Sequence, residues 1–270
     1  MKYALLADVH SNLEALTAVL AAARAEGAER IVCLGDLVGY HADPGPCLDL
    51  LRDAGAIAVA GNHDRAVAGI SEPDRFGLAG RRAIHWTRAH LSEEHRRYLA
   101  ELPLCHVEAG DGSEGGFLVV HAALHPAPNA DVYLATRAAV RATFAALRKW
   151  PGQQRLAFFG HTHHPVVHEL HGDRLFRREG SMFHLARGRH HLVNPGSVGQ
   201  SRDDDPRAAF AIFDAEARRL WLHRTDYDRE ACLAKARAAG LLVEPPARTS
   251  RLDRLRVAAM KSFRRLGGQS

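Results

Sequence analysis

The chain opens with Tyr3-Ala-Leu-Leu-Ala-Asp-Val-His10, an apolar run that ends in two polar side chains two positions apart. A short apolar run bounded in this way is typical of a buried strand. Residues 13–25 follow with Ala and Leu at helical spacing, and residues 31–34 form a second apolar run. Because strand, helix and strand come in immediate succession, this stretch predicts a β-α-β unit with two parallel strands.

The same alternation continues through the first 160 residues. Helices are predicted at 44–54 and across 78–101, where Ser92 has the character of an N-cap and divides the segment in two. Further buried strands are predicted at 57–59, 118–120 and 156–159, with a helix at 136–149 between the last two. This half of the chain therefore has the pattern of an α/β protein.

From residue 166 the pattern changes to short strands separated by turns. These strands are predicted at 166–170, 190–193, 209–213 and 220–223, and they favour antiparallel pairing. A last helix is predicted at 228–239. Since the chain contains no internal repeat and no clear linker before residue 244, we expect one domain over residues 1–245.

The positive charge of the chain is concentrated at its end. The 270 residues carry a net charge of +5, and 46% of them are hydrophobic, which suffices for a substantial core. Residues 246–270 hold seven Lys or Arg against one acid, so this tail carries +6 and residues 1–245 carry −1. Because residues 1–245 are nearly neutral, general binding to nucleic acid or membrane is excluded as their function.

The basic tail at 246–270 has apolar residues at helical spacing with arginines between them. This pattern predicts an amphipathic helix that docks on the body or on another subunit. The alternative is that the tail binds nucleic acid, another acidic partner or a membrane surface.

Several sequence features bear on location. No segment approaches the roughly 20 apolar residues of a membrane-spanning helix. The apolar run at 3–7 is too short for the core of a secretion signal. The four cysteines form no CxxC pair and lack the spacing of a zinc site, which favours buried thiols in a reducing compartment. We therefore expect a cytoplasmic protein without a membrane span.

Polar side chains follow five of the predicted strands at the point where each strand ends. They are Asp8 and His10, Asp36, Asn62 with His63 and Asp64, His121, and His161 with His163. Sites in open α/β sheets form beyond the carboxyl ends of the strands, so these side chains should converge. In extended chain, residues i and i+2 point the same way, so each pair with this spacing can aim two ligands at one pocket.

A mixed set of Asp, His and Asn side chains suits divalent metal ions, and thiolate-binding metals are disfavoured. Seven candidate ligands are too many for one ion but suit two ions that share a carboxylate. Manganese is the first expectation, with iron, nickel, cobalt and zinc as alternatives. Gly35, Gly61 and Gly160 stand just before the polar residues, where they should let the backbone turn sharply as it leaves the strand.

The ordered fragments D-x-H, G-D, G-N-H-D, H and G-H-T-H, from Asp8 to His163, resemble the calcineurin-like metallophosphoesterase family. The strings at 35–40 and 194–199 are similar to those of its small prokaryotic phosphodiesterase branch. The resemblance implies an α/β, four-layer αββα sandwich, the metallo-dependent phosphatase fold, in which helices flank two central mixed sheets. It implies a ligand set by position: the first metal takes Asp8, His10 and His163, the second takes Asn62, His121 and His161, and Asp36 bridges both.

The resemblance also implies a reaction. A metal-bridged hydroxide attacks phosphorus, and His63 faces the scissile phosphate as an acid or electrostatic stabiliser, oriented by Asp64. The leading hypothesis is hydrolysis of a small or nucleotide-derived phosphodiester. The alternative is a phosphomonoesterase, including a protein or dinucleoside polyphosphate phosphatase. A third hypothesis, a non-catalytic scaffold of the same fold, is disfavoured because all eight functional positions are retained.

Candidate substrate-binding residues lie around these positions. Asn62 and His63 come first. His41 and His125 lie near the expected rim, where a solvated loop position is the alternative for each. The resemblance places Asn194, in Asn194-Pro-Gly-Ser-Val-Gly199, beside the active site, although the same string also forms tight turns. Arg65 and Arg202 are further candidates for phosphate contact.

Overall fold

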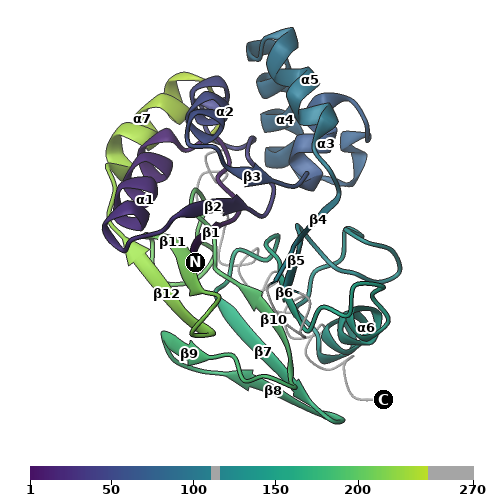
Figure 1. The fold of residues 1–270 in the computed structure, drawn as a ribbon. Helices are drawn as coiled ribbons and strands as arrows, with labels where there is room; N and C mark the ends of the chain where they lie inside the picture. The colour runs from purple at the N-terminus through teal and green to yellow at the C-terminus, as the bar shows by residue number, and fades with distance from the viewer. Residues whose placement is uncertain (111–115, 243–270) are drawn as a thin grey trace, which may run out of the picture.

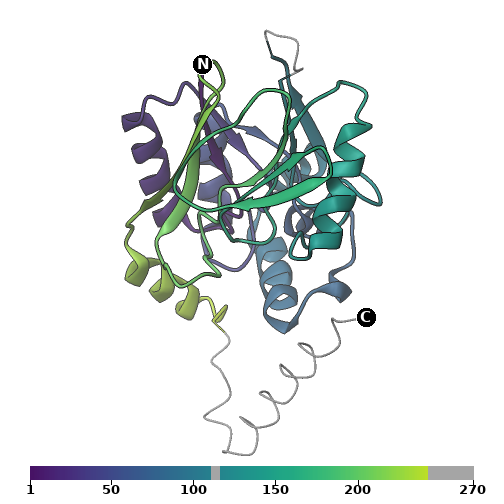
Figure 2. The same ribbon diagram turned by 90° about the horizontal axis from the view of Figure 1, so that it is seen from below.

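The computed structural model describes residues 1–110 and 116–242, and these form two β-sheets packed face to face with helices outside them (Figure 1). Seen from below, the two sheets lie between flanking helices as separate layers (Figure 2). The predicted basic tail at 246–270 lies outside the described residues. Within them, no helix has the length and apolar character needed to cross a bilayer.

The first sheet has the strand order β3-β2-β1-β11-β12-β9. Its strands are β1 (Lys2–Leu6), β2 (Arg30–Cys33), β3 (Ile57–Ala58), β9 (Met182–His184), β11 (Ala208–Asp214) and β12 (Arg219–Thr225). β1 pairs in parallel with β2 and antiparallel with β11, which makes the sheet mixed. The opening apolar run therefore lies at the centre of this sheet, as its lack of polar residues requires.

The second sheet has the order β4-β5-β6-β10-β7-β8. Its strands are β4 (Cys105–Glu108), β5 (Phe117–Val120), β6 (Leu156–Phe158), β7 (Val166–His171), β8 (Arg174–Arg178) and β10 (His190–Asn194). Of the strands predicted beyond residue 166, β7, β11 and β12 pair only antiparallel, as expected. β10 differs because it also runs parallel to β6.

Alternate residues of the strands divide the core into layers. Tyr3, Leu5 and Ala7 of the β1 segment pack with Phe158 and Phe213 between the two sheets. The intervening residues of the first sheet pack against α1 (Leu13–Ala25) and α2 (Pro44–Asp53), and those of the second sheet pack against α6 (Arg137–Arg148). This arrangement confirms the αββα sandwich and follows from the two-residue period of a strand.

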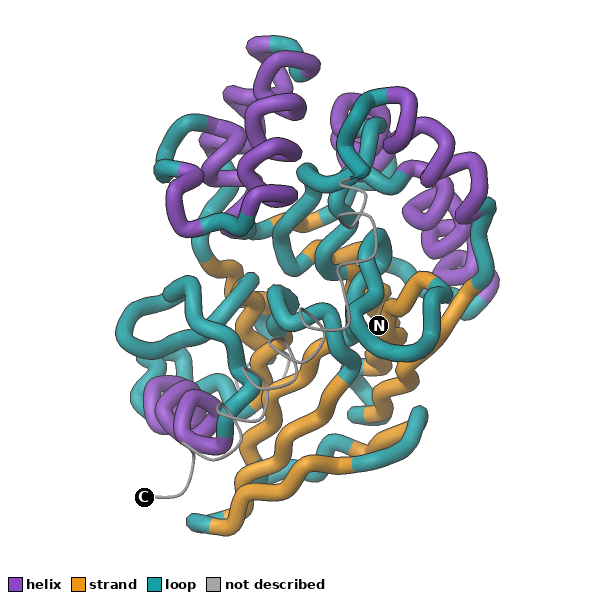
Figure 3. Tube along the Cα trace, turned by 180° about the vertical axis from the view of Figure 1, so that it is seen from behind, coloured by secondary structure: helices purple, strands orange, loops and turns teal. Residues whose placement is uncertain are grey.

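The remaining helices lie beside α1 and α2 or extend the end of the sandwich that carries the strand-end loops. They are α3 (Asn62–Ala68), the 3-10 turn η1 (Pro73–Arg75), α4 (Leu78–His90), α5 (Glu93–Glu101) and α7 (Arg229–Ala238). From behind, α3, α4 and α5 form a group separate from α1, α2 and α7 (Figure 3). The predicted division at Ser92 is confirmed, since its hydroxyl accepts a hydrogen bond from His95 N at 3.1 Å.

Three strands and one helix were not predicted from the sequence. β4, β8 and β9 are edge strands with few buried residues, so they lack a continuous apolar run. The helix is α3, which begins at Asn62, where the sequence predicted only a loop. Asn62, His63 and Asp64 therefore lie in the first turn of a helix.

Candidate metal centre

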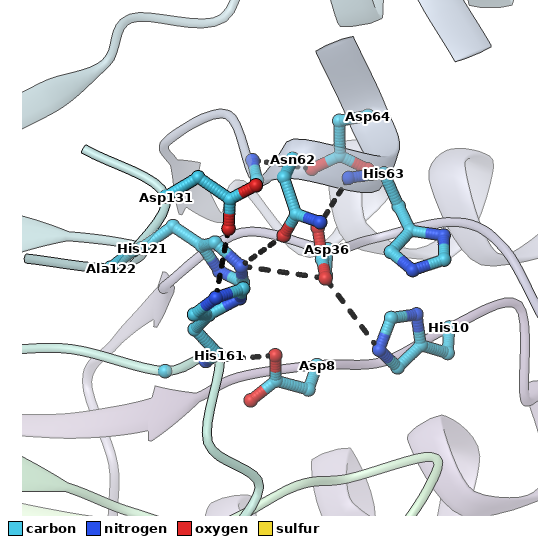
Figure 4. A network of polar contacts seen from close by, with 12 residues as sticks. Asp8, His10, Asp36, Asn62, His63, Asp64, His121, Ala122, Asp131 and His161 are labelled. Carbon is cyan, nitrogen blue, oxygen red and sulfur yellow. Dashed lines mark hydrogen bonds and ion pairs between the residues drawn. The ribbon is translucent and has the colours of Figure 1, made fainter. Parts of the chain in front are cut away.

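The five predicted strand ends converge at one place between the two sheets (Figure 4). Asp8 and His10 follow β1, Asp36 follows β2, and Asn62 begins the helix after β3. His121 follows β5, and His161 and His163 follow β6. Six of these seven side chains are at least 97% buried, and Asn62 is half-buried. The predicted convergence of these strand ends is therefore confirmed.

The seven side chains form two groups that share one carboxylate. Asp8, His10, Asp36 and His163 each offer a ligand atom within 4.8 Å of the others, and so do Asp36, His121 and His161. Asn62 belongs beside the second group, because its Oδ1 lies 3.0 Å from His121 Nε2. This division matches the one that the sequence resemblance implied, with Asp36 common to both groups.

In the first group, the candidate ligand atoms lie close to one another and face a common point. His10 Nε2 lies 3.2 Å from His163 Nε2 and 3.6 Å from Asp36 Oδ2. His163 Nε2 lies 3.5 Å from Asp8 Oδ1, while Asp8 Oδ2 is buried without a partner. An unpaired buried carboxylate oxygen beside two imidazole nitrogens is costly unless a cation binds there.

In the second group, Asp36 Oδ2 lies 3.4 Å from His121 Nε2. The other oxygen of Asp36 accepts a hydrogen bond from His63 N at 2.9 Å, which fixes the carboxylate. Asp8 Oδ1 accepts from His161 N at 3.0 Å and so ties the loop after β6 to the loop after β1.

Three of the candidate histidine ligands are oriented by main-chain carbonyls. Nδ1 of His10 lies 3.2 Å from Val38 O, Nδ1 of His121 lies 2.8 Å from Leu34 O, and Nδ1 of His163 lies 2.6 Å from Gln200 O. A carbonyl can only accept, so Nδ1 carries the proton. This leaves the Nε2 lone pair of each ring for a metal ion.

The charges of the cluster also fit divalent cations. Burial lowers the pKa of His10 and His163, the latter to about 3, and these rings are therefore neutral ligands at pH 7. Burial raises the pKa of Asp8 to about 7. Burial disfavours charge on His121 as well, but the carboxylates of Asp36 and Asp8 outweigh it and raise the pKa of His121 to about 10. Bound cations would replace that proton as the partners of the carboxylates.

Five of the seven candidate ligands have left-handed backbone conformations. The φ angles are 54° at Asp8, 50° at His10, 54° at Asp36, 65° at His161 and 59° at His163. A non-glycine residue in this region costs on the order of 1–3 kcal/mol, and such residues cluster at functional sites. The strain is offset by main-chain hydrogen bonds between the loops, such as His10 N to Asp36 O at 3.0 Å.

The glycines before the ligands act mainly by allowing close approach. Gly35 has a positive φ of 86°, as predicted for a sharp turn. Gly61 and Gly160 do not, because their role is to leave room for neighbouring loops. A Cβ on Gly61 would lie 2.0 Å from Asp36 Oδ1, and one on Gly160 would lie 3.0 Å from Ala7 Cβ.

Replacing Gly61 with alanine should displace the shared carboxylate and weaken metal binding, because the new methyl group cannot coexist with Asp36 Oδ1 in its present position. Calorimetric titration with Mn²⁺ measures the effect, with Gly69→Asn as the control, since a Cβ there meets nothing within 4 Å and asparagine tolerates its left-handed backbone. Wild-type affinity in Gly61→Ala would contradict the close packing of these two loops.

His63 lies at the metal centre but belongs to neither ligand group. Its ring packs against His10, Tyr40 and Phe76 at centroid distances of 4.9, 4.6 and 4.7 Å. Burial lowers the pKa of His63 to about 4, and its Nδ1 is buried without a hydrogen-bond partner. The ring is therefore a neutral imidazole held by aromatic contacts.

The expectation that Asp64 orients the His63 ring is wrong. Asp64 Oδ1 accepts from Leu37 N at 2.9 Å and Val38 N at 3.2 Å, and its Oδ2 accepts from Gly61 N at 2.9 Å. These bonds engage both oxygens with the main chain of the two ligand-bearing loops. Asp64 therefore holds the loop after β2 against the start of α3, and its effect on His63 is indirect.

Of the expected rim residues, two are buried and one is exposed. His41 is 8% exposed, and its Nδ1 lies 3.0 Å from His10 O, so it supports the first loop and is not solvated. Asn194 is fully buried. Its Nδ2 donates to Gly160 O at 2.6 Å, so it positions the loop after β6 and cannot contact substrate. His125 is exposed and is absent from the lining of the described cavities.

A cavity of about 130 Å³ opens at the metal centre. Besides candidate ligands and His63, it is lined by Tyr40 from the string at 35–40 and by residues outside the motifs, namely Arg75, Phe76, Gly77, Asp131 and Tyr133. Arg202, a weak candidate from the sequence, lines it as well. A larger cavity of about 550 Å³ shares Asn62, Arg75, Phe76 and Asp131 with it, and includes the other candidate arginine, Arg65. Apart from Asn62 and Tyr40, these residues lie outside the motifs, so only the folded chain brings them to the site.

The fold and sequence were compared with those of known proteins. An uncharacterized protein of Methanocaldococcus jannaschii is 37% identical over 226 residues, covering 83% of this chain and 87% of that protein. The crystal structure of a metallophosphoesterase from Sphaerobacter thermophilus matches with a TM-score of 0.72 and 34% identity, covering 90% of this chain and 95% of the other. A hypothetical protein from Pyrococcus horikoshii shares the fold with a TM-score of 0.71 and 19% identity, over 89% and 94% of the two chains.

The model of the calcineurin-like phosphoesterase superfamily domain matches residues 1–218. That match spans both sheets through β11 and every candidate ligand. It agrees with the resemblance carried by the five ordered fragments and with the αββα fold. The chain therefore belongs to the calcineurin-like phosphoesterase superfamily.

Proposed function

We propose that this protein is a metal-dependent phosphodiesterase acting on a small or nucleotide-derived diester, with Mn²⁺ as the first choice among divalent ions. The observation that carries the proposal is the arrangement of cavities around the metal centre. The cavity of about 130 Å³ has room for a phosphate group, and the adjoining cavity of about 550 Å³ has room for an organic substituent.

A third cavity shares no lining residue with these two. It has a volume of about 410 Å³ and is lined by Leu134 and Thr162, the chain neighbours of Tyr133 and of the ligands His161 and His163. A diester phosphate carries one organic group on each side. The reason to favour a diester is the resemblance of the strings at 35–40 and 194–199 to the small prokaryotic phosphodiesterase branch.

Asp8, His10, Asp36 and His163 would hold one ion, and Asp36, Asn62, His121 and His161 the other. When bound, such a pair supplies an activated water nucleophile and neutralises the phosphate oxygens. The chain supplies the remaining contacts. His63 can donate a hydrogen bond to the phosphate or to the leaving oxygen, and the aromatic rings around it restrict its motion.

A phosphomonoesterase is the second candidate, and one observation favours it. Arg75 and Arg202 both line the smaller cavity, and neither forms an ion pair within residues 1–110 and 116–242. Two guanidinium groups beside two metal ions would suit the dianion of a monoester better than the monoanion of a diester.

Parallel assays of bis(p-nitrophenyl) phosphate and p-nitrophenyl phosphate with Mn²⁺ distinguish the two candidates. We expect kcat/KM for the diester to exceed that for the monoester, because the strings at 35–40 and 194–199 resemble those of phosphodiesterases. Faster hydrolysis of the monoester would overturn the diester proposal. Failure to hydrolyse either ester with Mn²⁺, Fe²⁺, Co²⁺, Ni²⁺ or Zn²⁺ would favour the non-catalytic scaffold.

A further inference from the structure

His161 is oriented differently from the other histidine ligands. Its Nε2 lies 2.9 Å from Asp131 Oδ1, a contact drawn in Figure 4. In His10, His121 and His163, the second ring nitrogen faces a neutral main-chain carbonyl. Among the candidate ligands, His161 is therefore the ring whose outer partner is a carboxylate.

The position of Asp131 is fixed by the backbone around it. Ala123 and Ala130 exchange two main-chain hydrogen bonds of 3.1 Å, which close the loop after β5. Within that loop, Asn129 Oδ1 accepts from His121 N at 3.1 Å and Ala122 N at 2.9 Å, and its Nδ2 donates to Ala60 O at 2.7 Å. Asn129 thus ties the segment that carries Asp131 to a ligand of the second group.

Tyr133, two residues further on, covers one face of the same histidine. The two rings are stacked with a centroid distance of 4.1 Å and an interplanar angle of 27°. Asp131 and Tyr133 therefore restrict both the in-plane rotation and the tilt of the His161 ring. Within the described parts of the chain, no other candidate ligand histidine contacts both a stacked tyrosine and a carboxylate that come from the same segment.

We propose that Asp131 is a positioning residue for the second metal: its carboxylate, 2.9 Å from His161 Nε2, orients the ring so that Nδ1 binds the ion. The proposal rests on the metal centre of the proposed function. A carboxylate partner makes an imidazole a stronger donor than a carbonyl does, and loss of such a partner typically weakens metal binding by about 10–100-fold. Asp131 would therefore set the affinity of the second site and leave the first unchanged.

The test is calorimetric titration of the metal-free full chain with Mn²⁺, together with metal analysis after dialysis. Wild type should bind two ions. Asp131→Ala should bind the first with wild-type affinity and the second about 10–100-fold more weakly. Asp131→Asn should lie between the two, because an amide oxygen can still orient the ring without the negative charge.

Asp74→Ala is the matched control, since Asp74 lines the same cavity of about 550 Å³ as Asp131 but forms no ion pair with a candidate ligand in the described parts of the chain. It should bind both ions as wild type does. Equal affinities of Asp131→Ala and wild type at the second site would overturn the proposal, as would an equal loss at both sites. A wild type that binds fewer than two ions would instead contradict the metal centre of the proposed function.

Discussion

Replacing Asp36 with alanine should abolish the binding of both metal ions and, with it, hydrolysis. Asp36 is the residue common to the two ligand groups, and its Oδ2 lies 3.6 Å from His10 Nε2 and 3.4 Å from His121 Nε2. Every other candidate ligand belongs to one group, so its loss should weaken one site more than the other. Metal analysis after dialysis and calorimetric titration with Mn²⁺ measure the result.

Asp53→Ala is the control for the Asp36 variant, because Asp53 is an exposed acid at the end of α2, away from the strand-end loops. Asp36 also accepts a hydrogen bond from His63 N, so circular dichroism must verify that Asp36→Ala is folded. Retention of two ions by a folded Asp36→Ala protein would show that the carboxylate is not shared, and the two-ion arrangement would have to be abandoned.

Replacing His63 with alanine should have the opposite combination of effects: normal metal content and strongly reduced turnover. His63 lines the cavity at the metal centre but lies outside both ligand groups. Loss of a group that donates a proton or hydrogen bond in the transition state typically reduces kcat by about 10²–10⁴-fold. Steady-state kinetics and metal analysis on the same preparation measure both quantities.

The His63 ring also packs against three other rings, so its removal leaves a cavity. His63→Gln restores part of the volume without the imidazole and separates packing from chemistry. His85→Ala, at an exposed position in α4, is the control. Turnover near the wild-type level in both His63 variants would remove this residue from the mechanism, whereas loss of metal would make it part of the ligand framework.

The fold was predictable from the sequence where at least three successive strand positions are apolar. β1, β2, β5 and β6 have this property because they are central strands covered on both faces. The edge strands β4 and β8 carry exposed Val107 and Phe176 among polar residues, and no local pattern distinguishes them from loops. Their pairing is a property of the assembled sheet.

The candidate ligands were predictable because each one directly follows a strand, and short motifs therefore place them. The supporting residues were not. Asp131 and Tyr133 lie in a loop after β5 whose path is set by Asn129. Arg202 was a candidate from the sequence, but only the turn after β10 brings it to the site. Asp64 was assigned the wrong partner because adjacency to His63 in sequence does not fix where a carboxylate points within the first turn of a helix.

The candidate ligands come from both sheets, and this has a consequence for the stability of the fold. Asp8, His10, Asp36 and Asn62 follow strands of the first sheet, while His121, His161 and His163 follow strands of the second. Each ion would therefore take ligands from both sheets and link parts of the chain more than 100 residues apart, as Asp8 and His163 are. Such a link restricts the unfolded chain as a cross-link closing a long loop does, so metal loading would contribute to the cohesion of the two halves of the sandwich.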